Sequence, residues 1–76
     1  MAKGLQRAFS LEVRALRVEQ GLTQEELADR AEVHVNYVGM IERCERSPTL
    51  PVIEGIARGL GVKVSELLRR AENRNR

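Results

Sequence analysis

The octet GLTQEELA, at residues 21–28, is the feature that most constrains how this chain folds. Thr23 is a favourable N-cap, and Glu26 three positions later completes the pattern of a capping box. Leu22 and Leu27 flank this box as a hydrophobic staple. A second apolar run follows after a short break, so the pattern predicts two short helices joined by a tight turn.

The apolar spacing along the whole chain predicts an all-α fold with five helices. Apolar residues recur at intervals of three and four, and no segment alternates as a strand does. We expect helices over residues 7–19, 24–31, 35–43, about 50–60 and about 64–71. Residues 1–6 are then a flexible N-terminal lead-in, residues 7–72 the domain, and residues 73–76 a frayed C-terminal tail.

Length and charge limit the class of protein. A chain of 76 residues forms one small domain whose limited core favours oligomerisation. The net charge of +2 averages an acidic first half and a basic second half. A single cysteine excludes an internal disulfide, and no apolar run has the length of a membrane span or secretory signal, so we expect a cytoplasmic protein.

Four motifs follow one another along the chain: GLTQEELA, YVGMIER at 37–43, SPTL at 47–50 and IARGLGV at 56–62. In this order they resemble the lambda-repressor and Cro-like (XRE-type) helix-turn-helix regulators over about residues 13–68. Within that family, the short length and the run YVGMIERCER resemble the controller proteins of restriction-modification systems. The resemblance implies a five-helix DNA-binding domain whose second and third helices form the helix-turn-helix.

The segment 35–43 fits the demands of a helix that reads the major groove, which is about 12 Å wide and admits one helix. Its outer positions Val35, Asn36, Gly39 and Met40 are the predicted base contacts. Asn36 can pair with adenine, and the apolar side chains can touch a thymine methyl group. The alternatives are an ordinary exposed amide at Asn36 and a tight helix crossing at Gly39.

Phosphate contacts are predicted around this helix. Gln24 lies at the positive end of the preceding helix, where the family has a phosphate contact. Arg43 and Arg46 follow the recognition helix, and Tyr37 and Ser47 are weaker candidates. The alternative is that these side chains are solvated surface groups or caps.

Four positions bear on the structure of the domain rather than on contact with DNA. Arg17 and Glu42 occupy the places of an internal ion pair in the family, so the resemblance assigns them a structural role. Cys44 stands where the family most often has glycine, which predicts either a left-handed residue under strain or a different exit from the helix, with an ordinary thiol rather than a redox switch. His34 replaces the usual hydroxyl cap, so the third helix can start a residue away from Val35.

The leading functional hypothesis is a sequence-specific regulator that binds double-stranded DNA as a homodimer on a palindromic operator. Val64, Leu67 and Leu68 are the predicted dimer surface, unless they only cover the first helix. The resemblance also implies activation and autorepression, with RNA polymerase as a further partner for the acidic second helix. The alternative is an antitoxin-like or adaptor module with the same fold.

An enzyme is not expected. The chain has one histidine, one cysteine and scattered carboxylates, which supply neither a nucleophile with its base nor a metal-ligand set. We therefore expect no catalytic residue, metal, cofactor or small-molecule ligand, and no membrane partner.

Overall fold

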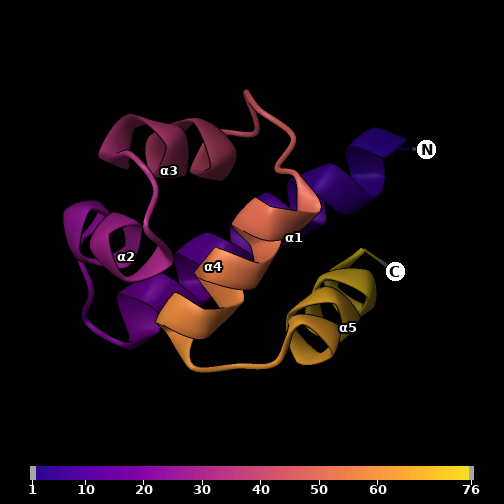
Figure 1. Cartoon of the computed structure of the whole chain (residues 1–76). Helices are drawn as coiled ribbons and strands as arrows, with labels where there is room; N and C mark the ends of the chain where they lie inside the picture. Colours follow the sequence, from indigo (N-terminus) through magenta and orange to yellow (C-terminus); the bar gives the residue numbers. More distant parts are fainter. Residues whose placement is uncertain (1, 76) are drawn as a thin grey trace.

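The computed structural model describes residues 2–75, and five helices account for most of that part of the chain (Figure 1). They are α1 (Ala2–Glu19), α2 (Gln24–Ala31), α3 (Val35–Glu42), α4 (Leu50–Leu60) and α5 (Val64–Arg74). No strand occurs between residues 2 and 75. The prediction of an all-α, five-helix fold is confirmed.

The first and last helices are longer than predicted. Residues 2–6 belong to α1, so the predicted lead-in is wrong for them, while Met1 lies outside the described residues. The added turn has a packing reason, because Leu5 faces the same apolar hollow as Phe9 and Leu68. At the other end α5 continues through Arg74, two residues past the predicted end of the domain.

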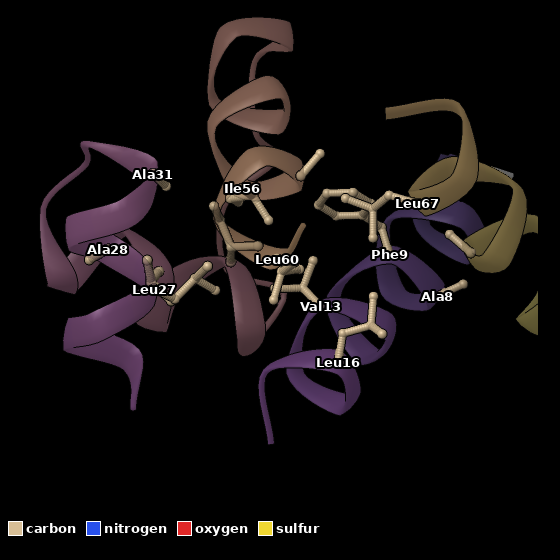
Figure 2. Packing of buried hydrophobic residues seen from close by; sticks show 14 residues of the cluster. Ala8, Phe9, Val13, Leu16, Leu27, Ala28, Ala31, Ile56, Leu60 and Leu67 are labelled. Carbon is tan, nitrogen blue, oxygen red and sulfur yellow. The ribbon is translucent and has the colours of Figure 1, made fainter. Parts of the chain in front are cut away.

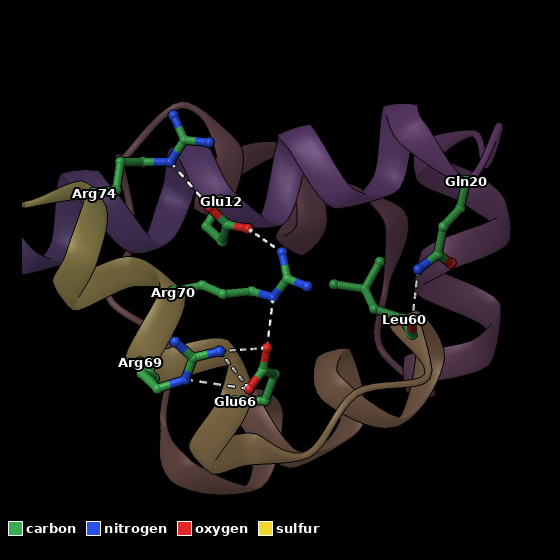
Figure 3. Close-up of polar contacts among 7 residues, drawn as sticks. All are labelled: Glu12, Gln20, Leu60, Glu66, Arg69, Arg70 and Arg74. Carbon is green, nitrogen blue, oxygen red and sulfur yellow. Dashed lines mark hydrogen bonds and ion pairs between the residues drawn. The ribbon is translucent and has the colours of Figure 1, made fainter.

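Polar contacts with Glu12 of α1 explain why α5 stays helical to its last turn. Glu12 of α1 is buried, and its Oε1 accepts a hydrogen bond from Arg74 Nε at 3.0 Å (Figure 3). Arg70 lies 3.6 Å from the same carboxylate and is also paired with Glu66. The last turn of α5 is therefore held against α1 by charge as well as by apolar contact.

Four of the five helices end at a left-handed residue. Gly21 and Gly61 have φ of 71° and 74°, as their sequence positions predict. Glu32 and Cys44 have φ of 59° and 60° without the freedom of glycine. The left-handed backbone predicted at Cys44 is confirmed, whereas no sequence signal marked Glu32.

The core lies between α1, α4 and α5 and extends to the two shorter helices (Figure 2). Phe9 and Val13 of α1 and Ile56 and Leu60 of α4 are buried in it. Leu67 is also fully buried, so its assignment to the dimer surface is wrong. No helix among the described residues is long and apolar enough to cross a membrane.

Close packing between α2 and α4 fixes where the second helix lies. A Cβ atom built on Gly55 would lie 2.6 Å from the backbone oxygen of Ala31, and one on Gly59 would lie 3.0 Å from Leu27. Both glycines therefore let the α4 backbone approach α2 more closely than a side chain permits. Since α2 supports α3, this crossing also sets the position of the third helix.

Candidate nucleic-acid interface

The start of α3 is set by an unusual cap. His34 has extended backbone, and its Nδ1 accepts a hydrogen bond from the Asn36 N–H at 3.0 Å. The helix therefore begins at Val35, as predicted, with the imidazole in the role of the expected hydroxyl. Asn36 is exposed on the outer face, while Val35 and Met40 are half-buried. Three of the predicted base-contacting residues thus keep accessible surface.

Gly39 is covered in this structure. It is buried, and a Cβ atom there would lie 3.0 Å from Arg43 Nη1 and 3.7 Å from Gln24 Oε1. Two flexible side chains cover this glycine and no backbone of another helix approaches it, so the alternative of a tight helix crossing is wrong, while the base contact at Gly39 stays a prediction. Gly39 leaves room for the guanidinium of Arg43 to lie across α3.

An ion pair joins α1 to α3, which confirms the structural role predicted for Arg17 and Glu42. Arg17 Nε donates to Glu42 Oε2 at 2.6 Å, and its Nη2 donates to Oε1 at 3.0 Å. Arg17 also donates to the Leu22 carbonyl at 2.8 Å. The side chain of Glu42 is only 3% exposed, and its hydrogen bond raises the pKa of Arg17. This pair is therefore part of the scaffold.

Gln24 links this pair to the start of α2. Its Nε2 donates to Glu42 Oε1 at 3.0 Å, so the amide is turned toward the scaffold. The capping box predicted here is confirmed, because Thr23 and Glu26 exchange hydrogen bonds of 2.8 and 3.0 Å. The first amides of a helix have no partner within the helix. The backbone N–H of Gln24 is therefore a donor without a partner inside α2, at the positive end of that helix.

The segment after α3 carries the predicted phosphate-binding side chains. Arg43 makes two hydrogen bonds to Glu45, which raise the pKa of Arg43 and lower the pKa of Glu45. The guanidinium of Arg46 lies 5.3 Å from the centre of the Tyr37 ring, a cation–π contact, and Ser47 is exposed. The structure thus brings Arg43 to the end of α3 and Arg46 beside Tyr37, the third residue of that helix. Sequence reasoning missed Glu45, although its place between two arginines was a visible signal.

An apolar hollow is lined by residues of α1, α4 and α5 and by Ser47 and Pro48 of the segment that follows α3. This hollow of about 350 Å³ is lined mainly by apolar side chains, and the half-buried Leu68 is one of them. Val64 is also half-buried, so both keep surface for a partner, unlike Leu67. The lining residues are Leu5, Gln6, Phe9, Ser47, Pro48, Ile53 and Leu68. The sequence missed Leu5 here because its segment had no apolar period.

These elements match a known family. The helix-turn-helix family model covers residues 13–67, which include all of α2, α3 and α4. The chain belongs to this helix-turn-helix family. It is a helix-turn-helix transcriptional regulator, as the four sequence motifs predicted. Its relatives are regulators rather than enzymes.

Two relatives and one solved structure show the range of similar proteins. Control protein C.BamHI of Bacillus amyloliquefaciens is 35% identical over 69 residues, which are 90% of this chain and 85% of that protein. The immunity repressor protein of Bacillus phage phi105 is 38% identical over 56 residues, 74% of this chain but only 39% of the repressor. The structure of the controller protein C.AhdI from Aeromonas hydrophila has a TM-score of 0.78 at 35% identity, over 82% of this chain and 94% of that one.

Proposed function

We propose that this regulator is a controller-type protein that recognises a specific DNA sequence and acts as a homodimer on a two-fold symmetric operator. The observation that carries the proposal is the outer face of α3. Asn36 is exposed there, and the side chains of Gln24 and Arg43 both lie beside Gly39 of the same helix. A face of this kind supplies base contacts from its own exposed side chains and phosphate contacts from the residues beside it.

The base contacts follow from side-chain chemistry. The amide of Asn36 has the donor and acceptor that pair with the major-groove edge of adenine. The accessible parts of Val35 and Met40 suit thymine methyl groups. We therefore expect an A·T pair in each half-site. Arg43 and Arg46 then position the helix by contacts with the backbone phosphates.

The apolar hollow beside α5 supports a homodimer. Leu5, Ile53 and Leu68 line this hollow. Leu50, at the start of α4 and three residues before Ile53, is 69% exposed. A small domain gains stability when such a surface is covered by a second copy. Two-fold symmetry also gives two recognition helices, which a palindromic operator requires. We place the dimer surface here, with Val64 at its margin and without Leu67.

A contact with RNA polymerase is the further part of this proposal. Glu25, Glu26 and Asp29 are exposed on α2 and form an acidic surface beside the DNA-facing elements. This surface supports a contact with a basic region of polymerase when the operator lies next to a promoter. The proposal places the protein with DNA in the cytoplasm.

The test is selection from random duplexes followed by sequencing. A palindromic consensus is the expected result, whereas binding that stays indifferent to sequence at about 0.15 M salt overturns the proposal. The variant Asn36→Ala should lose about 1–3 kcal/mol of operator binding and relax the preference at one base pair per half-site. Asn73→Ala, the same change on the exposed surface of α5, is the matched control. Equal weakening on all sequences would instead assign Asn36 to phosphate.

A further inference from the structure

Glu45 is an acidic residue inside the basic segment that follows the recognition helix. Its two carboxylate oxygens hold two nitrogens of Arg43, with Nε to Oε2 at 3.0 Å and Nη2 to Oε1 at 3.1 Å. This bidentate arrangement is also the one by which a guanidinium binds a phosphate group. Glu45 therefore occupies the part of Arg43 that a DNA phosphate needs.

The backbone builds this arrangement. Cys44 has left-handed backbone, with φ of 60°, and this turns the chain back toward the last turn of α3. The Cys44 N–H donates to the Ile41 carbonyl at 3.0 Å, and the Glu45 N–H donates to the Met40 carbonyl at 2.8 Å. These two bonds complete a Schellman turn. The carboxylate of Glu45 is thus brought to Arg43 by the end of the helix itself.

The pair of Arg43 and Glu45 holds the guanidinium of Arg43 beside Gly39 of α3. Nη1 of Arg43 lies 3.0 Å from the Cβ position that a side chain at Gly39 would have, and Gln24 Oε1 lies 3.7 Å from the same position. The absence of a side chain at position 39 therefore leaves room for the guanidinium of Arg43. Arg43 is held on the same side of the molecule as Gln24, where the proposed phosphate contacts lie.

Exposure shows that this pair can open. The side chains of Arg43 and Glu45 are 58% and 54% exposed, unlike the buried pair of Arg17 and Glu42. An exposed ion pair contributes little to stability and is screened by salt. A DNA phosphate that is held at hydrogen-bond distance can therefore displace the carboxylate, whereas a distant phosphate cannot.

We propose that Glu45 is a specificity-determining residue that keeps Arg43 from phosphates in complexes with unrelated DNA and releases it on the operator. Only a fully seated α3 brings a phosphate close enough to displace the carboxylate. Glu45 then lowers the affinity for unrelated DNA more than the affinity for the operator. This inference rests on the proposed function, since it requires a preferred operator.

The test is Glu45→Gln, measured with an operator duplex from the selection and with a scrambled duplex of the same length over a range of salt. We expect the affinity for scrambled DNA to rise about three- to tenfold, because one more arginine per protomer reaches phosphate. The slope of log affinity against log salt should steepen by about 0.9 per protomer on scrambled DNA. On the operator, both quantities should change much less.

Two controls separate this effect from a change in net charge. Glu54→Gln removes the same charge from an exposed site on α4 and should move both affinities by one common factor. In an Arg43→Ala background, Glu45→Gln should no longer alter the ratio of the two affinities. If the ratio still changes in the Arg43→Ala background, or if Glu45→Gln leaves the ratio unchanged in the parent chain, this inference is overturned but the proposed function is not. A parent chain that binds all duplexes alike overturns the proposed function as well.

Discussion

Replacement of Cys44 by glycine should stabilise the fold, although it removes a side chain. Cys44 has φ of 60°, a conformation that costs an L-residue about 1–2 kcal/mol. Glycine avoids this cost but loses about 0.5–1 kcal/mol through the greater entropy of its unfolded chain. The thiol is half-buried beside Ser10 and Leu11, and its loss costs a few tenths of a kcal/mol. The balance is a gain of about 0.5 kcal/mol.

The matched comparison is with Cys44→Ala, which also removes the sulfur but keeps a Cβ atom in the left-handed region. We expect Cys44→Gly to be about 1 kcal/mol more stable than Cys44→Ala, a difference of about 4–8 °C in Tm for a domain of this size. Thermal unfolding followed by circular dichroism measures it. If the alanine variant melts at or above the temperature of the glycine variant, left-handed strain at Cys44 is not a significant term and the reasoning fails.

The remaining predictions concern packing and the buried ion pair. Gly55→Ala should destabilise the domain by about 1–2 kcal/mol, since overpacking against the Ala31 carbonyl outweighs a gain of about 1 kcal/mol in helix propensity. Gly59→Ala, whose nearest neighbours are side-chain atoms, should cost less, and urea unfolding that ranks the two in reverse contradicts this packing argument. Glu42→Ala should cost about 3 kcal/mol, because it leaves Arg17 without its carboxylate. A melt at the parent temperature would show that this pair is not structural.

The sequence predicted a helix well where the residues that determine its ends lie within a few positions of one another. The capping box of Thr23 and Glu26 is an example, because both of its hydrogen bonds lie within one turn. The start of α1 was missed for the opposite reason. Leu5 is placed by a hollow that it shares with Pro48 and Leu68, and these contacts span most of the chain. No periodicity within residues 1–6 indicates such partners.

The glycines show the same limit. Sequence reasoning offered a tight helix crossing as the alternative use of Gly39, but the structure has the close crossing at Gly55, against the backbone of Ala31. Which glycine is needed depends on which helices cross, and apolar spacing alone does not specify the crossing. Gly39 has a different use, since Arg43 lies over it.

The residue types of the site were predictable, but their partners in the free chain were not, and the partners decide how each residue can bind DNA. Gln24 and Arg43 both donate to carboxylates. The carboxylate of Glu42 is 3% exposed and is shared with Arg17, so withdrawal of Gln24 leaves a buried acceptor with one hydrogen bond fewer. Glu45 is 54% exposed, so water replaces Arg43 at little cost. We therefore expect Gln24 to bind phosphate through its backbone N–H and Arg43 to bind it through its side chain.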